Sequence, residues 1–162
     1  MILNNFNIFF DIEQTIIPSW NDIYFFNRKK IIDFIQNYNI KNIHIFSFAI
    51  RNEEDIKYFY DNIKPEIEDV FNVKIISYPT VEQMIETDSL VTGNNFDSIN
   101  SFISSRGKVG AFASWAKYNF SNQYNVLIDD VVPDKVVTDE NSNCKIQFIN
   151  AFSENYELIE PY

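Results

Sequence analysis

The sequence predicts an α/β fold: a Rossmann-like three-layer sandwich around a mainly parallel central sheet of about five strands. Short runs of β-branched and aromatic residues alternate with longer segments whose apolar residues recur every three or four positions. The run Phe6–Phe10 is almost continuously apolar, which is typical of a buried parallel strand. The chain has 162 residues and no Gly/Ser-rich linker, so we expect one domain over residues 1–162.

The expected elements follow one another along the whole chain. Strands are expected at 6–10, 43–47, 73–78, 124–128 and 145–149, and helices at 22–38, 53–71 and 108–120. Ser19 with Asp22 resembles a capping box for the first helix, and Asn52 is the expected N-cap of the second, which Pro65 should kink or divide. Short helical signals surround Gly93, and the segment 80–95 is a candidate for a small lid.

The composition restricts the partners that the protein can bind. A net charge of −10 opposes binding to nucleic acid or to an anionic membrane, so an anionic ligand has to be captured locally. No apolar stretch is long enough to span a bilayer, and the first residues lack the basic region and cleavage site of a signal peptide. A single cysteine, Cys144, cannot form an internal disulfide. We therefore expect a cytoplasmic protein.

Carboxylates follow two of the predicted strands at the point where each strand ends. Asp11 and Glu13 come after the first strand, and Asp129 and Asp130 after the fourth. In open α/β sheets these ends meet at one edge, where ligands bind. At ~4 Å and an effective dielectric constant of ~20, each pair of carboxylates repels by roughly 4 kcal/mol. Such a cluster favours a bound cation, and oxygen ligands without His or Cys favour Mg²⁺.

Hydroxyl and ammonium groups are expected at the same edge. Thr15 follows the first strand, Ser47 ends the second, and Lys108 begins a helix after Arg106 and Gly107. Such groups can bind and neutralise phosphoryl oxygens, while a carboxylate can act as a nucleophile. Lys108 and Arg106 compete for the cationic position, and Lys108 is favoured.

These residues resemble the four ordered motifs of the haloacid dehalogenase (HAD) superfamily. Asp11-x-Glu13-x-Thr15 after a strand resembles the first motif, hhhhDxDGT, and Ile45–Ser47 resembles the second. Lys108 is placed like the lysine of the third motif, and Leu127–Asp130 resembles the fourth. The order and spacing of these motifs cover nearly the whole chain.

The resemblance implies a role for each matching residue. Asp11 would be the nucleophile and a metal ligand, with Glu13 at the general acid/base position and its backbone carbonyl as a further ligand. Asp129 and Asp130 would complete a Mg²⁺ site. Ser47 and Lys108 would bind phosphate, and Thr15 would support the loop. The resemblance thus implies a HAD-like phosphatase, acting through an aspartyl-phosphate on a phosphorylated small molecule or macromolecule.

Two residues depart from the family pattern, and they leave other functions open. Glu13 stands where the family has Asp, and a displacement of about 1 Å in a reacting group can cost ~100-fold in rate. Gln14 stands where the family has Gly. A catalytically weakened HAD-like binding or regulatory protein is therefore the first alternative. A metal-dependent nuclease of the PIN/NYN type, which also clusters acids at strand ends, is the second. The short intervals between motifs predict an uncapped or minimally capped site.

Overall fold

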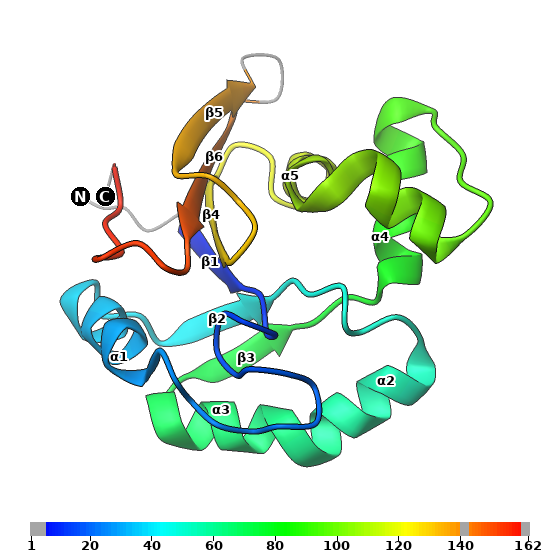
Figure 1. Ribbon diagram of the computed structural model, residues 1–162. Coiled ribbons are helices and arrows are strands. Elements are labelled where there is room, and N and C mark those ends of the chain that lie inside the picture. The colour runs from blue at the N-terminus through cyan, green and yellow to red at the C-terminus, as the bar shows by residue number, and fades with distance from the viewer. Residues whose placement is uncertain (1–5, 140–142, 160–162) are drawn as a thin grey trace.

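The computed structural model describes residues 6–139 and 143–159 and contains one six-stranded sheet with helices on both faces (Figure 1). The strands are β1 (Phe6–Phe10), β2 (Asn42–Ile45), β3 (Lys74–Ser77), β4 (Tyr124–Asp129), β5 (Lys135–Asp139) and β6 (Cys144–Asn150). The helices are α1 (Arg28–Asn37), α2 (Glu53–Tyr58), the π-helical turn η1 (Phe59–Ile63), α3 (Lys64–Phe71), α4 (Val81–Thr92) and α5 (Ile99–Asn119). Within the described ranges, no helix has the length and apolar content needed to cross a membrane.

The strand order is β3-β2-β1-β4-β6-β5, and all neighbouring pairs are parallel except β5 with β6. The predicted α/β class and mainly parallel sheet are confirmed. The chain runs from β1 outward to β2 and β3, and then returns to place β4 on the other side of β1. The strand order therefore reverses beside β1 and β4, which is where open α/β sheets form a ligand crevice.

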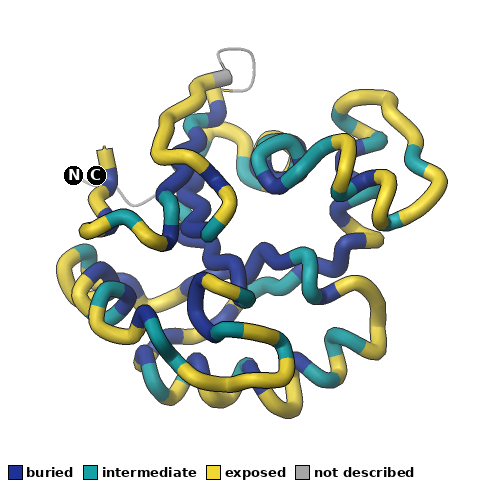
Figure 2. The backbone as a smooth tube through the Cα atoms, viewed as in Figure 1, coloured by how far each residue is buried: buried dark blue, intermediate teal, exposed yellow. Residues whose placement is uncertain are grey.

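Alternating residues of the central strands contact two separate hydrophobic cores. Ile8 and Phe10 face the core beneath α1, η1 and α3, whereas Phe9 faces the core beneath α4 and α5. Leu127 and Phe112 belong to this second core, and Phe9 and Phe112 pack edge to face with ring centroids 4.8 Å apart. Figure 2 shows buried residues concentrated along the central strands. The three layers follow from this two-residue alternation.

Local signals in the sequence account for several helix boundaries. Asn52 caps α2 as predicted, and its side chain accepts hydrogen bonds from the backbone N–H groups of Glu54 and Asp55. Pro65 lies in the first turn of α3, immediately after η1, which confirms the expected division of this helix. Residues 81–92 form one continuous helix, capped by a Thr80/Gln83 capping box. The segment proposed as a lid is therefore α4, and it packs against α5.

Two sequence-based expectations were wrong. Ser19 does not begin a helix: it pairs with Asp22 in an isolated antiparallel bridge, and α1 starts only at Arg28. The loop before α1 is held instead by tertiary hydrogen bonds, such as that from Asn27 Nδ2 to the carbonyl of Thr15. The prediction of about five strands omitted β5, a short edge strand that pairs with β6 as an antiparallel hairpin.

Candidate functional site

Asp11 and Asp129 lie side by side because β1 and β4 are parallel neighbours in register. Phe10 is paired with Ile128, so the next residue of each strand is an aspartate at the carboxyl edge of the sheet. The backbone N–H of Asp11 donates to the carbonyl of Ile128 at 3.0 Å, which extends the strand pairing by one residue. Both side chains are buried, with exposed fractions of 6% for Asp11 and 0% for Asp129.

The ammonium group of Lys108 lies between these two carboxylates. Lys108 Nζ donates a hydrogen bond to Asp11 Oδ1 at 3.0 Å and forms an ion pair with Asp129 Oδ2 at 2.6 Å. The same Nζ lies 4.7 Å from the centroid of the Phe48 ring. Lys108 therefore occupies the cationic position predicted from the sequence. Arg106, the competing candidate, points to α4 and binds Asp88.

Burial and charge shift the pKa of every ionisable group in this cluster. Burial raises the pKa of Asp11 and of Asp129 above the ordinary value, and the charge of Lys108 offsets the effect only in part. Burial and the neighbouring charge of Asp129 raise the pKa of Asp130. Burial acts to lower the pKa of Lys108, but the charges of Asp11 and Asp129 outweigh it, so the pKa of this lysine is raised.

Asp11, Asp129 and Asp130 fit a small divalent cation. Each offers one carboxylate oxygen, and these oxygens all lie within 4.8 Å of one another. Asp129 Oδ2 is fully buried and, apart from its ion pair with Lys108, accepts no hydrogen bond from the described residues. Three ionised carboxylates and one ammonium leave two negative charges, which one divalent ion would neutralise. An all-oxygen donor set of this kind suits Mg²⁺.

Glu13 lies on the wall of the same crevice but outside this group of three acids. Its Oε2 accepts a hydrogen bond from the backbone N–H of Trp20 at 2.6 Å, so the carboxylate holds the loop in place. The arrangement therefore does not support the Glu13 carboxylate as a metal ligand, and the proposed role of its backbone carbonyl stays a prediction.

Gln14 adopts the left-handed backbone conformation that glycine adopts without strain. Its φ is 62°, and its side chain donates to the carbonyl of Pro18 at 2.7 Å. A non-glycine residue in this region costs roughly 1–2 kcal/mol, which the hydrogen bond helps to offset. The turn is therefore formed without a glycine.

The two predicted hydroxyl residues are both buried beside the carboxylates. Thr15 Oγ1 lies 3.5 Å from Asp11 Oδ2, at the limit of a hydrogen bond. Ser47 Oγ accepts a hydrogen bond from the backbone N–H of Ala49 at 3.1 Å and lines the crevice. Because the Ser47 hydroxyl is an acceptor in this contact, its proton is available to a ligand.

The carboxylates open into a crevice of about 550 Å³. Sequence reasoning did not identify Arg51 or Phe48 as lining residues of this crevice. The guanidinium of Arg51 has no hydrogen-bond or ion-pair partner within the described residues. Its position four residues after Ser47 was the only sequence signal that could have identified it. The wall is formed by Asp11, Glu13, Gln14, Trp20, Ser47, Phe48, Ala49, Arg51, Asp55, Ile103, Lys108, Asp129, Asp130 and Val131.

Asn150 is a further residue that the sequence did not reveal. It ends β6, and its Nδ2 donates to the carbonyls of Asp130 at 3.2 Å and Val132 at 2.8 Å. Asp134 Oδ1 accepts a hydrogen bond from the backbone N–H of Asn150 at 2.8 Å. These contacts hold the loop that carries Asp130.

Comparisons with protein-family models, with curated proteins and with solved structures find no match to this chain.

Proposed function

We propose that this protein is a Mg²⁺-dependent phosphohydrolase of the HAD type that acts on a phosphomonoester. One observation carries the proposal: a buried aspartate, paired with a lysine and flanked by two further aspartates, lies at the carboxyl edge of a parallel sheet and opens into a crevice. Asp11, Lys108 and Asp129 form this arrangement. The ordered motifs that resemble the superfamily place the same residues in these roles.

In the proposed reaction, a carboxylate oxygen of Asp11 attacks the phosphorus atom, and the bond from phosphorus to the ester oxygen breaks. The leaving oxygen takes a proton, and Asp11 carries the phosphoryl group. Water then attacks phosphorus, the bond to Asp11 breaks, and inorganic phosphate is released. Glu13, on the crevice wall, would supply the proton to the leaving oxygen and later take one from water.

The surrounding residues would bind the phosphoryl group. Lys108 holds Asp11 through a hydrogen bond and would neutralise phosphoryl oxygens, while the hydroxyl of Ser47 would donate to one of them. Asp11, Asp129 and Asp130 would hold Mg²⁺, which supplies charge neutralisation to the transferring group when bound. An open crevice accommodates a substrate with a large leaving group.

The test is phosphate release from a panel of phosphomonoesters in the presence of Mg²⁺. We expect turnover in the wild type and a loss of at least about 10³-fold in Asp11→Asn, which keeps the shape of the side chain but removes the nucleophile. The exposed Asp33→Asn is a matched control and should retain activity. Absence of activity in the wild type, or unchanged activity in Asp11→Asn, would contradict the proposal.

A second candidate function is a HAD-like binding or regulatory protein without turnover. The hydrogen bond from Trp20 N–H to the Glu13 carboxylate supports it, because a carboxylate held in this way is less available for proton transfer. This candidate predicts Mg²⁺ binding without phosphate release, even in Glu13→Asp.

Incubation with single-stranded RNA and Mn²⁺ tests the nuclease alternative, for which the net charge of −10 is unfavourable.

A further inference from the structure

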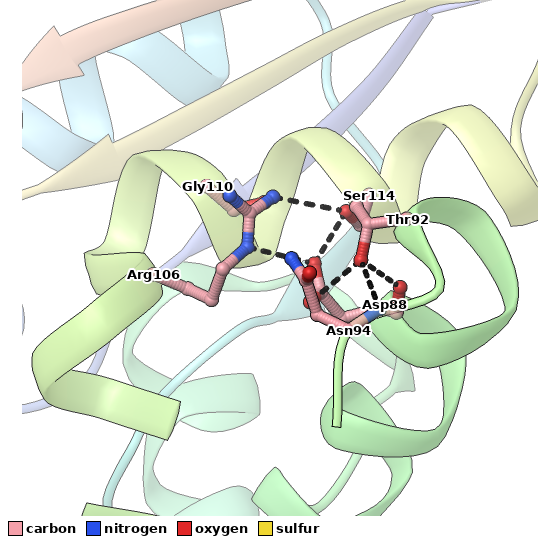
Figure 3. A network of polar contacts seen from close by, with 6 residues as sticks. All are labelled: Asp88, Thr92, Asn94, Arg106, Gly110 and Ser114. Carbon is pink, nitrogen blue, oxygen red and sulfur yellow. Dashed lines mark hydrogen bonds and ion pairs between the residues drawn. The ribbon is translucent and has the colours of Figure 1, made fainter. Parts of the chain in front are cut away.

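A second buried ionic network lies outside the crevice, between α4 and α5 (Figure 3). Asp88 is fully buried, and its Oδ1 accepts hydrogen bonds from Arg106 Nε at 3.0 Å and from Ser114 Oγ at 2.6 Å. Thr92 Oγ1 lies 3.4 Å from Asp88 Oδ2. A carboxylate without solvent contact is strongly unfavourable unless it is paired, so this network constrains how the two helices meet.

Arg106 also spans a break within α5. Gly107, the next residue, has φ 64° and ψ −176°, a conformation that is essentially restricted to glycine. Beyond the break, Arg106 Nη2 donates to the carbonyl of Gly110 at 3.3 Å and lies 3.4 Å from Ser114 Oγ. One guanidinium group therefore joins α4 to the part of α5 that begins at Lys108.

All three glycines of the chain lie at or near the junction between α4 and α5. Gly93 ends α4 with φ 78°, and Gly107 forms the break. Gly110 leaves room for the guanidinium, since a Cβ at this position would lie 3.1 Å from Arg106 Cζ.

We propose that Arg106, through Asp88 and Ser114, is a positioning residue for Lys108. Lys108 directly follows Gly107, so the conformation at the break sets the direction in which the lysine leaves the helix. That direction places Nζ between Asp11 and Asp129. The inference rests on the proposed function only for the role of Lys108 as a phosphate ligand, because the placement of Nζ can be measured without any enzymatic activity.

The test measures the reactivity of the Lys108 amine toward an acylating reagent, resolved by peptide mass spectrometry. Arg106→Met keeps most of the side-chain volume but removes the donors. Met84→Ala is the control, because Met84 is a buried α4 residue that makes none of the polar contacts of the network, and its truncation destabilises the fold by loss of packing. Lys41, an exposed lysine just before β2, reports the labelling rate of a solvent-accessible amine. Global unfolding is measured by urea titration of each variant.

We expect the labelling rate of Lys108 to be about tenfold higher in Arg106→Met than in Met84→Ala when the two variants are compared at equal global stability. The reason is that loss of the Arg106 contacts lets the backbone around Gly107 open locally. Gly107→Ala is a second variant, in which the added Cβ meets nothing within 4 Å and acts only through the backbone conformation. It should raise the labelling of Lys108 in the same way. Equal labelling of Lys108 in Gly107→Ala, Arg106→Met and Met84→Ala at equal stability would overturn the proposal.

A kinetic measurement separates this inference from the proposed function. If the wild type hydrolyses a phosphomonoester, Arg106→Met should lower kcat/KM about tenfold, whereas Met84→Ala should leave it within about twofold. If both variants lose kcat/KM equally, the positioning role is refuted. If the wild type has no activity but labelling of Lys108 still rises selectively, the positioning role holds and the phosphatase proposal fails.

Discussion

Replacement of Lys108 by methionine removes the cation that contacts the carboxylates of Asp11 and Asp129. Methionine is about as long as the aliphatic part of lysine, so the change removes the charge and leaves most of the packing against Phe48. The two acids stay buried in the folded state and lose their compensating charge. They then have to repel one another, bind a proton or capture another cation.

The expected loss of stability follows from the geometry. At an effective dielectric constant of ~20, attraction over 3.0 Å to Asp11 and 2.6 Å to Asp129 is worth roughly 5 and 6 kcal/mol. Much of this attraction offsets the cost of burying Lys108 itself, and loss of one partner of a buried pair typically costs about 3–5 kcal/mol. We therefore expect Lys108→Met to lower the free energy of unfolding by about 3–5 kcal/mol at pH 7.

The loss should shrink as the pH falls. In the variant, the folded-state pKa of one carboxyl group is raised further above its unfolded value, so the folded state binds the proton more tightly. The variant should therefore recover stability relative to wild type as the pH is lowered from 7 to 5. Addition of Mg²⁺ at pH 7 should also stabilise the variant, because a divalent ion can replace the lost ammonium charge.

Urea unfolding followed by tryptophan fluorescence measures each of these quantities. Lys41→Met, at an exposed position just before β2, is the control and should change stability by less than about 0.5 kcal/mol. A loss below about 1 kcal/mol in Lys108→Met at pH 7 would refute the ionic argument. An equal loss at pH 5 and pH 7 would refute the assignment to buried carboxylates.

Three further predictions follow from particular residues. Burial lowers the pKa of His44 from 6.5 to about 4, so the folded state disfavours the charged ring and stability is lost as the pH falls from 6.5 towards 4. In urea unfolding, the wild type should lose about 2 kcal/mol of unfolding free energy relative to His44→Gln when the pH is lowered from 7 to 5. A difference in unfolding free energy between the two proteins that does not change with pH would contradict this prediction. Asn52→Ala should cost about 1 kcal/mol through loss of the α2 N-cap, whereas Asn52→Asp should retain thermal stability. Glu13→Asp shortens the side chain and should break its hydrogen bond to the N–H of Trp20, so faster phosphate release is expected if Glu13 transfers protons. Release at the wild-type rate would contradict proton transfer by Glu13, and absence of release in both proteins would favour the binding role.

Much of the fold could be predicted because its central elements have strong local signals. The apolar runs at β1 and β4 identify buried strands, and Asn52 and Pro65 mark helix boundaries through side-chain and backbone chemistry. β5 was missed because it is a short edge strand whose pairing depends on β6. Ser19 was misread because a capping pattern is a local signal, whereas the loop is held by distant contacts such as Asn27 with Thr15.

The candidate site was predictable for a topological reason. Asp11 and Asp129 each follow a buried strand, and parallel neighbours in register bring such residues together. The orientation of Glu13 was not predictable, because its hydrogen bond to Trp20 depends on the path of a loop without regular structure. The burial of Asp88 was also not predictable, because it requires Arg106, which lies 18 residues away in the sequence.

The sequence by itself determined that carboxylates follow the ends of buried strands, because strand periodicity is a short-range pattern. The strand order that brings β1 beside β4 is set by tertiary packing. Only the tertiary structure decided which cation lies among them. Lys108 and Arg106 are two residues apart and carry the same charge, so the sequence could favour Lys108 for the site but could not show where either side chain points. The break at Gly107 separates them, directing Lys108 to Asp11 and Asp129 and Arg106 to Asp88.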